Sequence, residues 1–177
     1  MPAVAELDTV ASEQAAEMFR SCCGSPRWVA AMVARRPFGT RDAVLSTAAV
    51  LWRALSPADW QEAFRHHPRI GEHRAAAERP KRARAWSIDE QAGVRHTDAS
   101  ALQALATVNQ EYEQRFGWIY IVNAAGLSAD QLLLLARQRL MNSPETELHI
   151  AAGEHAQIML NRLAHLLADD RPGGSAS

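Results

Sequence analysis

The sequence predicts an all-α protein, a single-domain bundle of about eight to nine helices. Three Ser-Pro pairs carry the pattern of a helix start, because serine caps a helix and proline is tolerated at its first position. These pairs are Ser25-Pro26, Ser56-Pro57 and Ser143-Pro144. Apolar residues near the end of the chain recur at helical spacing, from Leu148 to Leu166. Only WIYIVNAAG, residues 118–126, has the composition of an extended segment, and too little strand is available elsewhere to build a sheet around it.

The first part of the chain divides into four predicted helices. They span residues 12–22, 26–35, 41–55 and 57–66. Gly24 is expected to cap the first helix at its C-terminal end. Arg36-Pro37 ends the second, since the residue before a proline is disfavoured in the helical region. Pro68 forbids further helix after the fourth.

The rest of the chain contains five predicted helices. They span residues 74–84, 88–94, 98–116, 129–141 and 144–168. The extended segment, closed by Gly126, interrupts this series and is expected at the core. One domain is expected over residues 1–177, with its core at about 12–168, a frayed N-terminus and a polar C-terminal tail.

Composition and charge argue against several classes of partner. The 177 residues carry a net charge of −1, which disfavours nucleic acid or an anionic membrane as the main partner. No run approaches the ~18 apolar residues of a membrane span. The N-terminus lacks a charged segment followed by an apolar run, so no secretory signal is expected. Cys22 and Cys23, the only cysteines, are adjacent and make a poor disulfide pair, which favours the cytoplasm.

Two adjacent histidines, His66 and His67, end the fourth predicted helix in the stretch FRHHPRIGE. A purely structural interpretation is available, because a cation complements the negative end of the helix dipole. Pro68 and Gly71 favour a functional interpretation instead, since the proline fixes a turn and the glycine permits close backbone approach. A histidine at the start of such a turn is well placed for proton transfer.

A second polar group lies in WSIDEQAGV, residues 86–94. Ser87 and Glu90 have the S-x-x-E spacing of a capping box, so local helix stability would explain both residues. Gln91 follows directly, and a helix N-terminus also offers free N–H groups to an anion. Capping and ligand binding are compatible, and the spacing leaves both open.

Arg162 lies in the last predicted helix, one turn beyond Ile158 and beside the apolar stripe. A surface arginine that packs its stem on apolar neighbours would explain this placement. His155, Arg162 and His165 nevertheless share one face at i, i+7 and i+10, which suggests a polar patch.

The motifs of most cofactor-dependent sites are missing from the sequence. There is no HExxH and no Glu-x-x-His pair, so neither a zinc protease nor a di-iron bundle is expected. No G-x-G-x-x-G or P-loop offers a cradle for a nucleotide, and no G-x-S-x-G elbow presents a serine nucleophile. No metal and no cofactor are expected.

Five groups of residues, in this order, resemble the 2-oxo-4-hydroxy-4-carboxy-5-ureidoimidazoline (OHCU) decarboxylases, which form (S)-allantoin at the end of the uricase route from urate. They are CCGSPRWVAAMVARRPF (22–38), HPRIG (67–71), SIDEQAG (87–93), EYEQRFGWIYIVNAAG (111–126), and NSPETEL (142–148) with the arginine of LNRL (160–163). Each is weak alone, but together they cover about residues 12–168 in register and are specific. The resemblance implies the all-α fold of that family.

The resemblance also implies a set of site residues. His67 looks like the family's catalytic histidine because it directly precedes Pro-Arg-Ile-Gly, while Glu90 and Arg162 match its catalytic glutamate and anion-binding arginine. The implied substrate-binding residues are Pro68, Ser87, Ile88, Asp89, Gln91, Tyr120, Ile121, Val122, Asn123 and Ala124. Asn123 departs from the family, in which many members carry a less polar residue.

The implied activity is cofactor-independent decarboxylation of a small anionic ureidoimidazoline by a cytoplasmic, homodimeric carboxy-lyase. His67 would either position the departing carboxylate or transfer a proton, and both roles stay open. Two other functions also stay open: a non-catalytic helical relative that binds ligands or acts as a scaffold, and a decarboxylase of a different small ureido acid.

Overall fold

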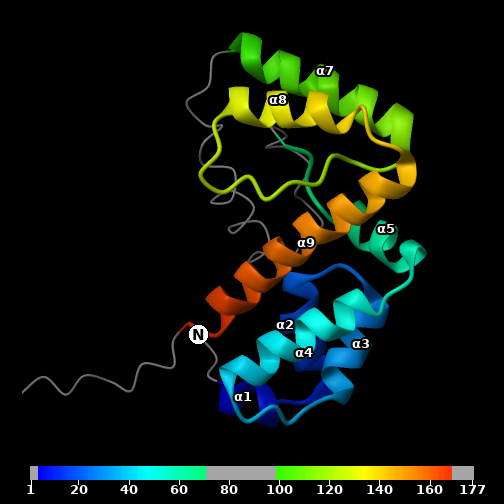
Figure 1. Ribbon diagram of the computed structural model, residues 1–177. Helices are drawn as coiled ribbons and strands as arrows, with labels where there is room; N and C mark the ends of the chain where they lie inside the picture. The colour runs from blue at the N-terminus through cyan, green and yellow to red at the C-terminus, as the bar shows by residue number, and fades with distance from the viewer. Residues whose placement is uncertain (1–3, 71–98, 169–177) are drawn as a thin grey trace, which may run out of the picture.

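The computed structural model describes residues 4–70 and 99–168, which form eight α-helices and no strand (Figure 1). The all-α prediction is therefore confirmed for this part of the chain. The helices are α1 (Val4–Thr9), α2 (Ser12–Cys22), α3 (Pro26–Ala34), α4 (Arg41–Arg53), α5 (Pro57–Arg65), α7 (Ala99–Phe116), α8 (Ala129–Arg139) and α9 (Pro144–Leu166). The predicted helices at 74–84 and 88–94 lie outside the described residues.

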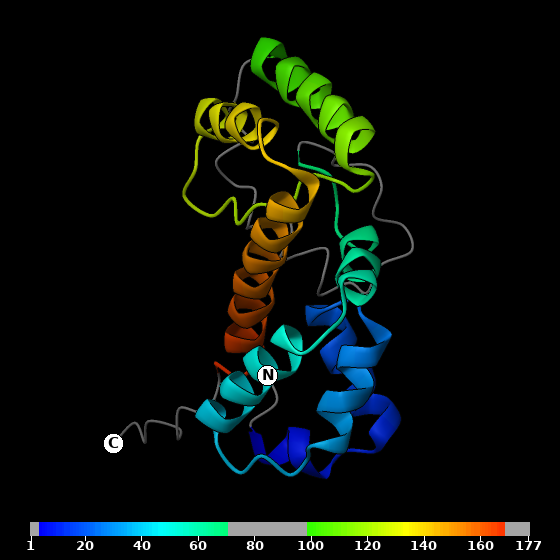
Figure 2. The ribbon, with the colours of Figure 1, turned by 45° about the vertical axis from the view of Figure 1, so that its right-hand side comes forward.

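The long helix α9 runs through the middle of the molecule and connects its two ends. Figures 1 and 2 show α1 to α4 gathered around one half of α9, and α7 with α8 beyond its other end. Helix α9 packs against α2, α4 and α5, while α7 packs against α8. Residues on different turns of α9 can therefore contact both ends of the molecule.

The three Ser-Pro pairs start helices as predicted. The side chains of Ser25, Ser56 and Ser143 each accept a hydrogen bond from the backbone N–H three residues on, at 3.3, 3.3 and 3.2 Å. The proline that follows each serine occupies the first turn of α3, α5 or α9. These caps satisfy donors that a helix start would otherwise leave without partners.

Helix α1 is the largest difference from the sequence-based expectation, which places a frayed terminus ahead of residue 12. Val4 and Leu7 are buried in the core. The Arg36 side chain donates to the carbonyls of Leu7 and Val10, at 2.9 and 2.7 Å. The expectation of fraying is wrong for residues 4–9, because contacts with residues far along the chain stabilise a segment that is too short to be helical alone.

Gly24 does not cap α2, contrary to the prediction. Cys23 takes that position with an extended backbone, and Gly24 is not among the described glycines with positive φ. A Cβ built on Gly24 would stand 2.4 Å from the Cβ of His66, at the end of α5. The glycine is therefore explained by a close approach between two parts of the chain rather than by a helix end.

Replacing Gly24 by alanine should destabilise the protein by roughly 1–3 kcal/mol, because the added methyl overlaps the rigid start of the His66 side chain. Urea unfolding measures the change in free energy. Gly153→Ala is the matched control: Gly153 lies within α9, nothing stands within 4 Å of its added Cβ, and alanine should stabilise the helix by roughly 0.5–1 kcal/mol. A Gly24→Ala protein as stable as the wild type would contradict the close approach.

The described apolar side chains form two core clusters. The first cluster joins α1 to α5 with α9; its largest members include Phe19, Trp28, Trp52, Phe64 and Met159. The second joins α7 and α8 with part of the 117–128 connection; its largest members include Leu105, Tyr112, Tyr120 and Leu132.

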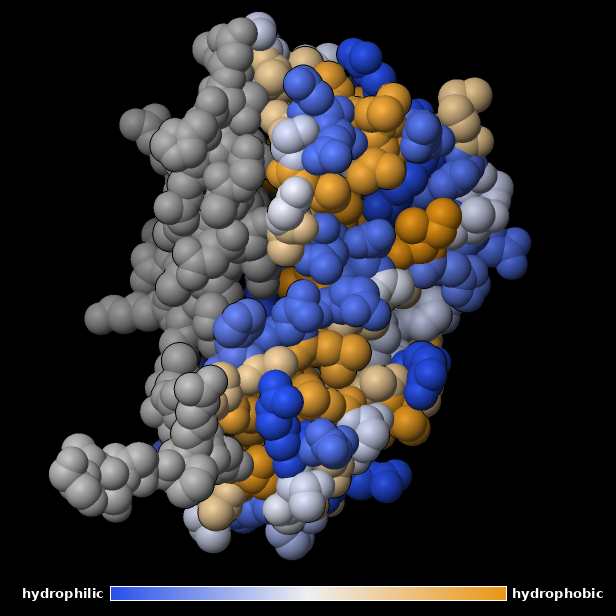
Figure 3. Space-filling view, turned by 60° about the vertical axis from the view of Figure 1, so that its left-hand side comes forward, coloured by the Kyte–Doolittle hydropathy of each residue, from blue (hydrophilic) through white to orange (hydrophobic). Residues whose placement is uncertain are grey.

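On the molecular face drawn in Figure 3, hydrophobic patches are small and separated by hydrophilic residues. None of the described helices has the length and apolar character needed to cross a membrane.

Candidate active site

A pocket lies where the end of α5, the 120–124 segment and the middle of α9 meet. Its described lining residues are His67, Pro68, Ile70, Tyr120, Ile121, Val122, Ala124 and Ile158. Ile121 and Ile158 belong to the first core cluster, whereas Ile70, Tyr120 and Val122 belong to the second. The pocket therefore lies at the boundary between the clusters, and it brings together two predicted site segments that are about fifty residues apart in the sequence.

The two adjacent histidines have different surroundings. His66 is exposed and forms the C-terminal cap of α5, with its backbone N–H donating to the Ala63 carbonyl at 3.1 Å. His67 is buried, its N–H donates to the Phe64 carbonyl at 3.0 Å, and its ring lines the pocket. Of the two histidines, therefore, it is His67 that lines the pocket, while its catalytic role stays a prediction.

A second imidazole, that of His155 on α9, lies directly against His67. The two ring centroids are 4.9 Å apart with an interplanar angle of 75°. His155 is completely buried, and its burial, followed by the charge of Arg162, lowers its pKa to about 3. The His155 ring is therefore neutral at physiological pH.

Arg162 is buried on α9, so the interpretation as a surface arginine is wrong. Its charge influences two buried side chains: it lowers the pKa of His155, and it opposes the burial that raises the pKa of Cys23 to about 12. Arg162 follows Ile158, a pocket residue, by one turn of the helix. His165 does not join this group, since it is exposed and its Nδ1 contacts the Asn161 carbonyl at 2.8 Å.

The 120–124 segment is non-helical and mostly buried, as the sequence predicts, and four of its residues line the pocket. The Arg139 Nη1 donates to the Ile121 carbonyl at 2.8 Å, and the Asn123 N–H donates to Glu154 Oε2 at 2.7 Å. Burial raises the pKa of Tyr120 to about 12, so its phenol stays protonated. Asn123 is not among the described lining residues, so its predicted contact with the substrate stays a prediction.

A buried polar network, formed by residues of α7, α8, the α8–α9 connection and the first turn of α9, is bonded to the 120–124 segment. Glu147 Oε1 accepts from Arg139 Nε at 2.7 Å and from the Tyr112 hydroxyl, and its Oε2 accepts from Asn142 Nδ2 at 2.7 Å. Arg139 also lies over the Tyr120 ring, 4.9 Å from its centroid. Because every charge in this network has partners, its interactions fix the 120–124 segment relative to α8 and α9.

Five of the thirteen predicted site residues fall outside the described residues, namely Ser87, Ile88, Asp89, Glu90 and Gln91. Their place in the site stays a prediction. Within residues 4–70 and 99–168, no group of three or more His, Cys, Asp or Glu side chains could hold a metal ion.

His155 and the Arg139–Glu147 network are the parts of the site that sequence reasoning missed. The spacing of His155 from Ile158 and Arg162 put it on the right face of α9, but did not indicate contact with His67. That contact depends on how α5 packs on α9, which no local pattern reports.

Together these groups suit a small anionic ligand. The pocket offers an imidazole and an apolar wall bordered by backbone polar groups, and the buried guanidinium of Arg162, which is not itself a described lining residue, lies one turn of α9 beyond Ile158. An anion can be desolvated in such surroundings if its charge stays paired.

Comparisons with known proteins agree on one family. The sequence model of a family described as OHCU decarboxylase matches residues 8–164. The uric acid degradation bifunctional protein TTL of Arabidopsis thaliana is 32% identical over 160 residues, which are 90% of this chain and 49% of that protein. The chain thus spans about half the length of this relative.

Two solved structures resemble the fold. One is a crystal structure of an OHCU decarboxylase in the presence of (S)-allantoin, with 33% identity, a TM-score of 0.74, and coverage of 86% of this chain and 99% of that one. The other is a crystal structure of an (S)-allantoin synthase, with a TM-score of 0.68 over 94% of this chain and 54% of that one. At 15% identity, this second likeness concerns the fold alone.

Proposed function

The chain belongs to the OHCU decarboxylase family, and we propose that it converts 2-oxo-4-hydroxy-4-carboxy-5-ureidoimidazoline to (S)-allantoin by decarboxylation, without a cofactor, in urate degradation. The observation that carries the proposal is the pocket, which His67 and Pro68 line together with residues of the 120–124 segment. These are the segments that the family resemblance assigns to the substrate site.

Decarboxylation makes two demands on this pocket. Loss of carbon dioxide leaves an electron pair on a ring carbon, which the substrate's own carbonyl and imine groups can delocalise. That carbon must then be protonated on one face to give a single enantiomer. A buried, one-sided pocket suits both demands, because it orients the ring and limits access of water.

His67 is proposed as the catalytic residue closest to the departing carboxylate. Its ring is buried and lines the pocket, so it can contact the substrate directly. An imidazole there can donate a hydrogen bond to the carboxylate or move a proton to or from the ring. Positioning and proton transfer are both compatible with its place beside Pro68.

Arg162 is proposed to bind the anionic part of the substrate. A guanidinium binds a carboxylate or an amide-like anion with two parallel hydrogen bonds, which fixes orientation as well as charge. Its burial strengthens such a pair, because fewer water molecules compete for the donors.

The remaining substrate contacts are proposed on the family resemblance. Glu90 is assigned a catalytic role, and Ser87, Ile88, Asp89 and Gln91 would bind the polar edge of the ring, together with the segment from Tyr120 to Ala124. We also propose that the chain forms one domain and acts as a homodimer in the cytoplasm.

The deciding experiment starts from urate, with uricase and hydroxyisourate hydrolase present, and adds this protein. We expect rapid formation of optically pure (S)-allantoin without added metal. Circular dichroism of the product measures both its rate of formation and its optical purity. Racemic allantoin at the spontaneous rate would favour the non-catalytic alternative. Activity on another ureido acid, but not on this substrate, would show that the protein is a decarboxylase of a different small ureido acid.

A further inference from the structure

The contact between His67 and His155 has no place in the proposed chemistry so far. His155 is not among the described lining residues of the pocket, but its ring contacts that of His67, which is. The edge-to-face arrangement of the two rings, at 4.9 Å, is within the range of favourable contacts between flat rings. His155 can therefore influence the site through His67.

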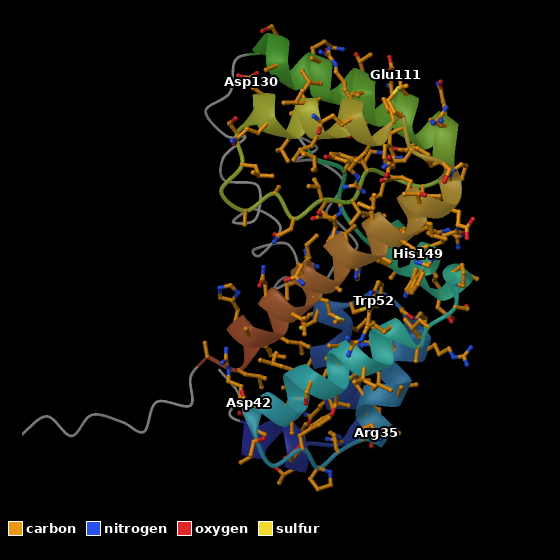
Figure 4. All side chains as sticks on the ribbon, viewed as in Figure 1. Arg35, Asp42, Trp52, Glu111, Asp130 and His149 are labelled. Atoms are coloured by element: carbon orange, nitrogen blue, oxygen red, sulfur yellow. The ribbon has the colours of Figure 1, made fainter. Side chains whose placement is uncertain are left out.

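Two ring contacts hold the His155 ring in place, and a hydrogen bond fixes one of the contacting rings. It stacks on Trp52 with the centroids 4.4 Å apart and the planes 10° apart, and it contacts Phe64 at 5.8 Å. The Trp52 Nε1 donates to the Ala152 carbonyl at 2.9 Å, three residues before His155 on α9. Figure 4 shows Trp52 where α4 meets α9. The ring that supports His67 is thus itself packed between two elements.

The His155 ring is also uncharged. Within the described residues, neither of its ring nitrogens has a hydrogen-bond partner, and its pKa of about 3 keeps the nitrogens from binding a second proton. A positive charge on His155 at this distance would disfavour protonation of His67. A neutral ring supports the orientation of His67 without that penalty.

We propose that His155 is a positioning residue, whose flat ring holds the His67 imidazole in the orientation needed at the pocket. This inference rests on the proposed function, in which His67 contacts the substrate. A side chain that acts on the site by orienting His67 should affect turnover more than substrate binding.

The test compares His155→Leu, which removes the flat ring, with His155→Phe, which retains it. In the coupled assay, the leucine variant should lose roughly 10- to 100-fold in kcat with little change in KM, because a small misplacement of a reacting group has that effect. The phenylalanine variant should restore kcat to within a few-fold of the wild type. Should the leucine variant not fold, His155→Met removes the flat ring in a more adaptable side chain.

His149→Ala is the matched control. His149 lies on the same helix and also contacts a tryptophan edge-on, with its ring 5.6 Å from that of Trp60, but its side chain is exposed and makes no described ring contact with His67 (Figure 4). Its kcat should equal that of the wild type. A leucine variant with wild-type kcat would overturn the proposal, and so would a phenylalanine variant as impaired as the leucine variant.

NMR of histidine-labelled protein gives a readout independent of activity. The ring signals of His67 should broaden or shift in the leucine variant and stay sharp in the phenylalanine and His149→Ala variants. Unchanged His67 signals in the leucine variant would count against the positioning role. If the wild-type protein formed no (S)-allantoin, the proposed function would fail, while this comparison would still decide the role of His155.

Discussion

His67→Asn is expected to remove most of the decarboxylase activity, with a loss of at least about 100-fold in kcat, as is usual when a group that positions or transfers a proton is lost. Asparagine retains a hydrogen-bond donor group but cannot take up a proton near neutral pH. The loss of kcat in the coupled assay measures the effect. The helical circular dichroism signal should stay unchanged, because His67 lies after the last residue of α5.

His66→Asn is the control for this prediction. His66 differs from its neighbour in being exposed and in capping α5, and it retains its Cβ packing against Gly24 when asparagine replaces it. Activity should fall by no more than a few-fold. Equal losses in the two variants would show that the division of roles within the pair is wrong.

Local signals predicted most of the fold. Each Ser-Pro pair started a helix because capping and proline geometry act within one turn. All seven predicted helices that fall in the described chain end within two residues of their predicted ends. Helix α1 escaped prediction because its stability comes from Arg36 and from burial of Val4 and Leu7, contacts that the local pattern does not contain.

The site was predictable only where residue types and family resemblance indicated it. His67 and the 120–124 segment could be paired before the structure was known because both belong to motifs of one family, although nothing in their spacing requires contact. The Gly24–His66 approach and the His155 ring could not be paired in this way. Both depend on how α5 packs against distant helices, and a glycine or a histidine carries no sign of its partner.

Glu147→Leu is expected to cost roughly 3–5 kcal/mol of stability, which is a large share of the 5–15 kcal/mol typical of a domain. The carboxylate is fully buried and accepts from Arg139, Tyr112 and Asn142. Its loss would leave the Arg139 charge buried without its carboxylate partner. Urea unfolding gives the change, provided that the slope of the transition is unchanged.

The matched control is Glu113→Leu, since Glu113 makes a two-point pair with Arg69, at 2.6 and 2.9 Å, on a half-exposed surface. That loss should be at most about 1 kcal/mol, because water screens exposed pairs. The double variant Arg139→Leu/Glu147→Leu should lose less stability than the two single variants added together, since no charge is then left buried alone. Additive losses would mean that the pair does not act as a unit. They would also remove the reason to regard Arg139, which donates to the Ile121 carbonyl, as the support of the pocket wall.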